Sequence, residues 1–284
     1  YQELSVLQDY LNDIHDEIGS YTNFGVSAYT FVIMGWIPAR HLPATRTVLQ
    51  EAFGGRVVTR ELGVTEGDMK LAPVWYDNPA WVRPFELVMS LVAVPKYREV
   101  DPSPILAIFF PLFFGIMVGD IGYGLIILAL GLLVRKKFPD IPFAQSMSGM
   151  LIISSIPTIV FGYFYGEFFG NFAEHMGWLH PMELLGITWN RAEAIIPMLI
   201  LAISIGVIHV FLGLGLGIRN AIILKNRHHL AERAGMILAI SAIILAIVTA
   251  AGALPAGMMY GAAVLMVIGL PLILDREVDF ITAM

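Results

Sequence analysis

The apolar and polar positions divide this chain into a polar N-terminal third and a long apolar remainder. From Ile105 onward, apolar stretches alternate with short charged connections. A helix of about 20 apolar residues is long enough to cross the ~30 Å hydrocarbon core of a bilayer. The pattern therefore predicts an integral membrane domain over residues 96–284, preceded by a polar domain over residues 1–95.

The membrane domain is expected to contain about six helices. Its first apolar stretch, 105–134, is nearly uncharged and is interrupted by Gly119 and Asp120. At about 1.5 Å per residue this stretch is long for one crossing and short for two, so we interpret it as a hairpin of two short helices that turns near Asp120. Four clearer spans follow at 147–165, 194–218, 234–253 and 256–274.

The basic residues orient these spans, because cytoplasmic connections are enriched in Lys and Arg. With six helices, eight of the nine Lys and Arg residues of the apolar region fall on one side, and Arg191 alone falls on the other. The chain opens on polar residues, without the basic start and apolar core of a cleavable signal. These features predict a multi-pass membrane protein whose N-terminal arm is cytoplasmic.

The polar domain is expected to be part of an α/β arm. Five aliphatic residues repeat at intervals of three and four, which is typical of a coiled-coil seam or of one amphipathic helix on a domain surface. They are Leu4, Leu7, Leu11, Ile14 and Ile18. Farther on, the pattern predicts a strand over 28–36, a helix over 43–53 and a strand over 56–62. The fold class is therefore mainly α: a polytopic α-helical membrane domain preceded by a small α/β lobe.

Composition excludes several classes of function. Of the 284 residues, 57% are hydrophobic and 14% are charged, whereas soluble domains are about 25% charged. Most of this chain therefore cannot face water. A formal net charge of −6 without a basic stripe argues against nucleic-acid binding. The absence of cysteine excludes disulfides and thiolate metal sites, and no phosphate-binding loop or catalytic motif occurs. We expect no catalytic residue, cofactor or metal site.

Ionisable groups inside the apolar stretches are the candidate functional residues, since each is costly in lipid unless it is paired. Asp120, near Tyr123 at the expected hairpin turn, either accepts backbone N–H groups or belongs to an ion path; Glu167 has the same two interpretations. His209 lies deep in its span, where it either bonds to a neighbouring carbonyl group or relays protons. A structural Asp120 is expected to tolerate replacement by Asn, because an amide oxygen also accepts turn hydrogen bonds.

Several motifs resemble the stator subunit of rotary V-type ATPases, which is called subunit a or subunit I. The most specific motif spans 109–124 and reads FFPLFFGIMVGDIGYG. Other segments that carry the resemblance are 35–38, 78–86, 95–102, 165–170 and 205–209. The resemblance covers most of the chain from residue 35 to residue 233, and it points to the compact prokaryotic branch, in the plasma membrane of a bacterium or archaeon.

The resemblance implies the stationary half of a rotary proton motor, or in some members a sodium motor. In this family, two offset half-channels load and unload a carboxylate on each small proteolipid subunit of a rotor ring. The cytoplasmic arm links the membrane to peripheral-stalk subunits, and the other implied partners are a central-stalk or ring-cap subunit and the lipid bilayer. ATP binds on other subunits, and no nucleic acid is implied.

The family's essential arginine is not expected in this chain. Arg191, Arg219 and Arg233 lie at expected helix ends, and the family's arginine-bearing last helices would lie beyond Met284. On this interpretation the chain is a fragment that forms the base of the arm and a scaffold beside the ion path. Its candidate residues then have a supporting or structural role. The alternative is a stand-alone secondary transporter or a membrane scaffold protein, and a transporter predicts internal repeats.

Overall fold

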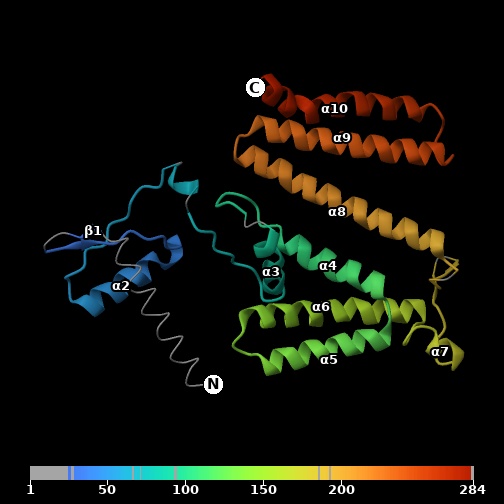
Figure 1. Cartoon of the computed structure of the whole chain (residues 1–284), viewed down its shortest axis with the longest axis horizontal. Coiled ribbons are helices and arrows are strands. Elements are labelled where there is room, and N and C mark those ends of the chain that lie inside the picture. Colours follow the sequence, from blue (N-terminus) through green and yellow to red (C-terminus); the bar gives the residue numbers. More distant parts are fainter. Residues whose placement is uncertain are drawn as a thin grey trace. The chain divides into compact units, whose positions relative to one another are not determined.

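The computed structural model describes residues 25–26, 29–65, 67–70, 72–92, 95–184, 186–191 and 193–282. The chain forms two compact units, Tyr1–Trp75 and Tyr76–Met284, and helices dominate the second unit (Figure 1). The expected coiled-coil seam over 4–18 lies outside the described residues. The domain boundary expected at residue 95 stays a prediction.

The first unit contains a short hairpin and one longer helix. Strand β1 (Gly25–Val26) pairs antiparallel with β2 (Phe31–Val32). Helix α2 (Leu42–Phe53) agrees with the helix expected over 43–53, and it ends at Gly54, whose left-handed backbone (φ 55°) suits a residue without Cβ. Two short 3-10 turns complete the regular structure of the described part, η1 (Ala39–His41) and η2 (Asp68–Lys70).

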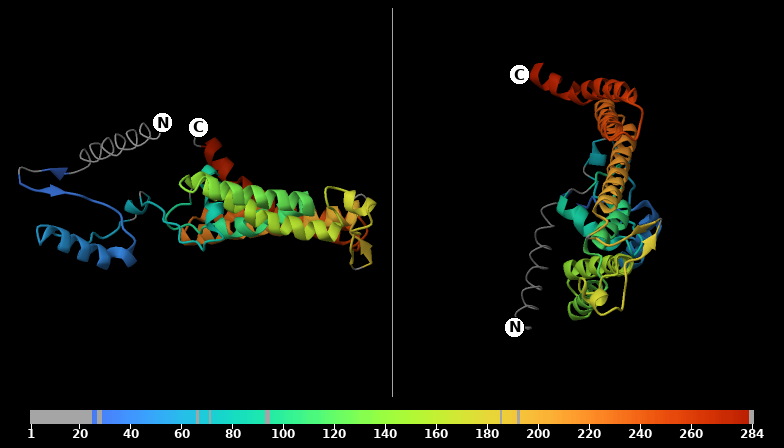
Figure 2. Two further views of the ribbon diagram at one scale, coloured as in Figure 1. Left: turned by 90° about the horizontal axis from the view of Figure 1, so that it is seen from below. Right: turned by 90° about the vertical axis from the view of Figure 1, so that its right-hand side faces the viewer.

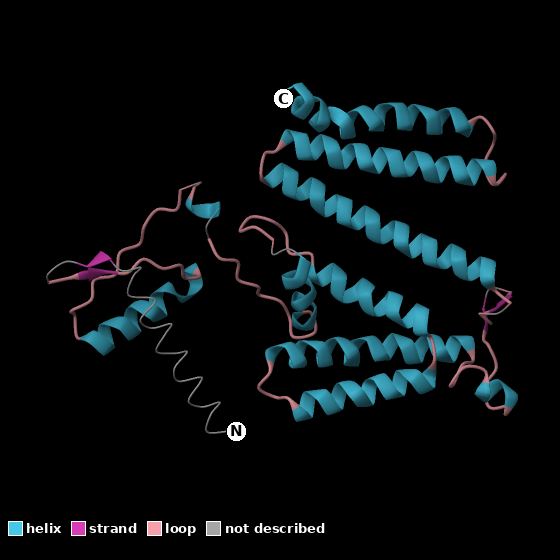
Figure 3. Ribbon diagram, in the orientation of Figure 1, coloured by secondary structure: helices cyan, strands magenta, loops and turns pink. Residues whose placement is uncertain are grey.

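The strand prediction for residues 56–62 is wrong. These residues have no regular secondary structure, because an extended segment becomes a strand only when a neighbour supplies ladder hydrogen bonds. Of the strand expected over 28–36, the described residues 29–36 contain only the two residues of β2. Figure 3 shows strands only as short pieces among the described residues, so the structure does not establish an α/β arm.

The second unit begins with four helices that we call the first helix group. They are α3 (Arg83–Val92), α4 (Ser103–Val118), α5 (Ile121–Lys137) and α6 (Pro142–Tyr165). Helix α6 packs against the other three. Val82, Phe85, Ala107 and Met150 are buried together where α3, α4 and α6 meet. The sequence analysis did not predict α3, which directly follows a stretch that contains prolines and tryptophans.

The second helix group consists of α8 (Ile195–Ile223), α9 (Arg227–Ala250) and α10 (Met258–Thr282). Helix α9 packs along both α8 and α10, and the right-hand view of Figure 2 shows the three helices in that order. Between the groups lie α7 (Phe172–His175) and a hairpin of β3 (Glu183–Leu184) and β4 (Ile187–Thr188).

Three helices in the described part of the chain, α6, α8 and α9, are long and apolar enough to cross a membrane. Helix α4 and the apolar part of α10, Met258–Leu274, are shorter apolar helices. At 16 residues, α4 is about 24 Å long, which is less than the ~30 Å hydrocarbon core. The chain is thus a mainly helical protein with three candidate membrane spans. The expected hairpin corresponds to α4 and α5, and the count of six membrane helices stays a prediction.

Two glycines set the close approach of α9 and α10. A Cβ on Gly235 would lie 2.7 Å from the carbonyl oxygen of Gly269, and a Cβ on Gly269 would lie 3.0 Å from the carbonyl oxygen of Gly235. Small residues let helix backbones approach in lipid, where packing replaces the hydrophobic driving force. The contact therefore depends on the absence of side chains at both positions.

Gly235→Ala should weaken the α9–α10 contact by about 1–3 kcal/mol, because the added methyl group has no space. Thermal unfolding of the detergent-solubilised chain, followed by circular dichroism, measures the loss. Gly206→Ala in α8 is the matched control, since nothing lies within 4 Å of a Cβ there; alanine should leave stability unchanged or raise it by up to about 1 kcal/mol. Equal melting temperatures for the two variants would contradict this account of the contact.

Candidate functional site

Three segments meet at one end of the first helix group: the α4–α5 turn, the residues that follow α6, and the residues that precede α8 (Figure 1). They bring together Asp120, Glu167 and Arg191 through side-chain and backbone hydrogen bonds. Asp120 and Glu167 were expected as separate candidates. Arg191 was expected only as an isolated cation at a helix end.

Asp120 is a buried carboxylate, with 1% of its surface exposed. Its Oδ1 accepts the backbone N–H of Tyr123 (2.9 Å) and of Phe169 (3.1 Å), and its Oδ2 accepts the N–H of Gly170 (2.6 Å). The Tyr123 bond is an N-cap on α5, where the positive end of the helix dipole also favours an anion. Both oxygens are therefore occupied, which favours the structural interpretation of Asp120.

The local backbone is shaped around this carboxylate. Phe169 (φ 50°) and Gly170 (φ 68°) both adopt the left-handed conformation, and successive N–H groups in such turns form a concave nest for an anion. A Cβ on Gly162 would meet the backbone of Asp120, so α6 approaches the turn only because that position is glycine. The backbone N–H of Ile121 also donates to the carbonyl oxygen of Glu167 (3.0 Å).

Arg191 and Glu167 form a two-point ion pair beside Asp120. Nε of Arg191 lies 2.8 Å from Oε1 of Glu167, and Nη2 bonds to Oε2. The guanidinium also donates to the carbonyl oxygens of Met117 (2.9 Å) and Val118 (3.2 Å), at the end of α4, and its carbon lies 5.3 Å from the centre of the Tyr165 ring. Helix C-termini leave such carbonyl groups without intrahelical partners, and a cation suits them.

The ion pair keeps Arg191 charged. The hydrogen bond with Glu167 raises the pKa of Arg191 above its ordinary value, against the lowering effect of partial burial. Only 13% of the Glu167 side chain and 34% of the Arg191 side chain are exposed. A bidentate, partly buried pair of this kind is among the stronger polar contacts in proteins. It is the feature that the sequence did not reveal, and the one available signal was the isolation of Arg191 from the other cations.

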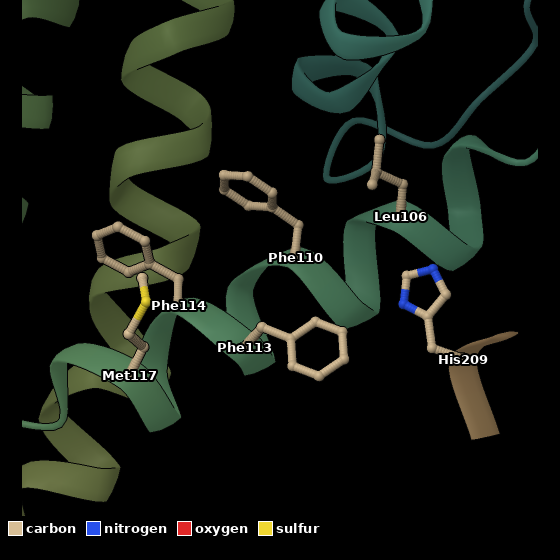
Figure 4. A pocket seen from close by; sticks show the side chains of 6 residues that line it. All are labelled: Leu106, Phe110, Phe113, Phe114, Met117 and His209. Atoms are coloured by element: carbon tan, nitrogen blue, oxygen red, sulfur yellow. The ribbon is translucent and has the colours of Figure 1, made fainter. Parts of the chain in front are cut away.

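His209 belongs to α8 and lies apart from this junction, where it packs against the middle of α4. Its ring is 4.6 Å from that of Phe109 and 5.6 Å from that of Phe113, with the second pair stacked. Among the described residues it makes no hydrogen bond, so the bond to a carbonyl group that one interpretation expects is not found. Figure 4 shows its imidazole at one end of an apolar groove of about 230 Å³. The groove is lined by Leu106, Phe110, Phe113, Phe114, Met117 and His209.

Tyr123 contributes its backbone N–H to Asp120, while its ring is half-exposed and packs edge-on against Phe169 at 5.5 Å. In the described part of the chain, no three His, Asp or Glu side chains are grouped closely enough to hold a metal ion. The junction anchors helix ends, whereas the groove carries an imidazole that has no hydrogen-bond partner among the described residues.

Comparison with known proteins finds relatives for most of the chain. Residues 13–173 match the V-type ATPase 116kDa subunit family. The A-type ATP synthase subunit I of Archaeoglobus fulgidus is 37% identical over 169 residues, which are 60% of this chain and 24% of the relative. That of Thermococcus kodakarensis is 32% identical over 194 residues, 66% of this chain and 29% of the relative. The V-type ATP synthase subunit I 2 of Treponema pallidum is 32% identical over 149 residues, which are 50% of this chain and 33% of the relative. The matched part of the chain spans 24–33% of the length of these relatives.

Asp120→Asn should destabilise the protein by about 1–3 kcal/mol, the cost of leaving a buried donor unsatisfied. For a structural Asp120, the sequence analysis expects that Asn is tolerated. The geometry predicts the opposite, because both carboxylate oxygens accept N–H groups and an amide offers only one oxygen. Thermal unfolding in detergent tests this, with Asp140→Asn at an exposed turn as the control. If the two Asn variants melt together, the Gly170 bond carries no stability.

Proposed function

The chain belongs to the V-type ATPase 116kDa subunit family, and from this membership we propose that it forms part of the stationary membrane subunit of a rotary ATPase. The family match over more than half of the chain is the observation that carries the proposal. Three candidate membrane spans support it, as do relatives named as subunit I of A-type and V-type ATP synthases. In this role the chain works beside a rotor ring of small proteolipid subunits and a central-stalk or ring-cap subunit.

The proposed orientation puts the N-terminal arm in the cytoplasm, where it links the membrane to peripheral-stalk subunits. Figure 1 supports it, because the α5–α6 and α8–α9 connections lie at one end of the helices. The last turn of α5 carries Arg135, Lys136 and Lys137, and α9 opens with Arg227. Basic residues gather on the cytoplasmic side of membranes. The junction of Asp120 with Glu167 and Arg191 then lies on the opposite side.

Within this role, we assign the candidate residues to two tasks. Asp120 and Glu167 hold the scaffold, because their carboxylate oxygens already bind backbone N–H groups and Arg191. His209 contributes to a proton half-channel, because its ring nitrogens have no hydrogen-bond partner among the described residues. A neutral imidazole has one nitrogen that donates and one that accepts a proton, so it can pass protons between water and a neighbouring carboxylate. The carboxylates it serves belong to the rotor ring.

A tagged subunit purified from its native membranes in mild detergent should bring down a ring of small proteolipid subunits and the nucleotide-binding subunits. Mass spectrometry of the purified complex identifies them by size and stoichiometry. An unrelated tagged multi-pass protein from the same membranes is the control. Recovery of the subunit by itself, from membranes that retain ATP-driven proton transport, would contradict a stator role.

His209→Phe should lower ATP-driven acidification of vesicles that contain the whole complex by about 100-fold, the usual contribution of a positioned proton-transfer group. Phenylalanine keeps the ring contacts with Phe109 and Phe113 and removes both nitrogens. Complex assembly, checked on native gels, should be unchanged. His180→Phe, at an exposed position, is the control. Wild-type acidification in an assembled His209→Phe complex would remove His209 from the proton path.

A further inference from the structure

The two helix groups of the second unit meet along the facing surfaces of α4 and α8, which we call the seam. Oδ1 of Asn220, near the end of α8, accepts the backbone N–H of Val100, just before α4 (2.9 Å). His209 packs on Phe109 and Phe113 at mid-height. Arg191, just before α8, binds the last carbonyl groups of α4. These contacts fall in reverse order along the two helices, so α8 runs antiparallel to α4.

Packing along the seam is open between these contacts. Gly206 and Gly213 lie about one turn on either side of His209, and a Cβ on either would have no neighbour within 4 Å. The apolar groove of about 230 Å³ beside His209 extends along Phe110, Phe114 and Met117. Protein interiors are close-packed, and an interface with gaps of this size has few contacts to resist a change in spacing.

The two ends of α8 are held differently. Its two buried residues, Leu214 and Ala221, both lie in the C-terminal half, where a Cβ on Gly217 would also lie 3.1 Å from Arg233 of α9. The N-terminal half contains no buried residue. At that end, the Arg191 side chain bridges the end of α4 and Glu167 after α6.

We propose that the second unit is a hinge with a latch: the second helix group pivots about the Asn220 end of α8, and Arg191 is the latch that fixes the opposite end. With the latch closed, as in this structure, the spacing of α8 from α4 is set and His209 stays stacked on Phe113. With the latch released, the N-terminal half of α8 moves away from α4 and the groove widens. The contact between α8 and α9 is unaffected, so the second helix group moves as one body.

Spin-label distances in the full chain, reconstituted in lipid nanodiscs, test the latch. The chain contains no cysteine, so spin labels attach only at the two cysteines introduced for each pair. The latch pair is Leu125→Cys with Leu199→Cys, and the pivot pair is Leu133→Cys with Ile222→Cys. A third pair, Leu199→Cys with Ile247→Cys, monitors the second helix group itself. All of these positions are exposed, so the labels do not disturb packing.

Arg191→Gln should broaden the latch-pair distances and lengthen them by several ångström, while the pivot pair and the α8–α9 pair keep their wild-type distances. Arg191→Lys should give an intermediate broadening, because an ammonium group cannot reproduce the two-point bond to Glu167. Arg219→Gln is the matched control, since Arg219 is an exposed arginine near the pivot end of α8, and it should change none of the three pairs.

Two outcomes would overturn the proposal. An unchanged latch pair in Arg191→Gln would mean that other contacts fix the spacing of α8 from α4. Broadening of all three pairs would mean that Arg191 supports the fold of the whole unit and does not act as a latch at one end. The three pairs together therefore separate release of one end from general loss of structure.

Discussion

A buried carboxylate in apolar surroundings must be surrounded by donors, and the end of the first helix group is built to meet that requirement. Asp120 is almost fully buried, and the cost of burying its charge is offset by backbone N–H groups from the start of α5 and from the loop after α6. The constraint reaches beyond the carboxylate, because the loop must adopt left-handed conformations at Phe169 and Gly170 to aim those groups. The turn, the loop and the approach of α6 at Gly162 depend on this one interaction.

The Arg191–Glu167 ion pair links the first helix group to the residues that precede the second helix group. Helix ends leave carbonyl groups without partners, and the end of α4 obtains two of its partners from a side chain that precedes α8. Arg191 and Glu167 thus connect the end of α4 to the start of α8, where apolar packing between the two helices is sparse. The contrast with the α9–α10 contact is direct: there, Gly235 and Gly269 bring the backbones close without any polar side chain.

In the proposed role as a stationary part of a rotary machine, these contacts hold the facing ends of α4, α5 and α6 together beside a moving ring. The candidate carboxylates hold helix ends, because backbone N–H groups and Arg191 already bind their oxygens. His209 differs from them, because its ring is held by aromatic packing alone and its nitrogens are unoccupied among the described residues. We therefore assign Asp120 and Glu167 to anchoring because their polar atoms have partners, and His209 to the proposed proton path because its ring nitrogens have none among the described residues.

The sequence by itself determined the apolar helices, the helix over 43–53 and the family, since hydrophobic length, helix-ending glycine and motif residues are local properties of the chain. It also singled out Asp120, Glu167 and His209, because an ionisable residue in an apolar stretch is visible without a structure. Only the tertiary structure decided that Arg191 pairs with Glu167, that both oxygens of Asp120 are used, that residues 56–62 form no strand, and that α3 exists. Each of these features depends on which distant segment supplies the hydrogen-bond or packing partner. Local sequence does not specify that partner, because tertiary packing determines which distant segments come together.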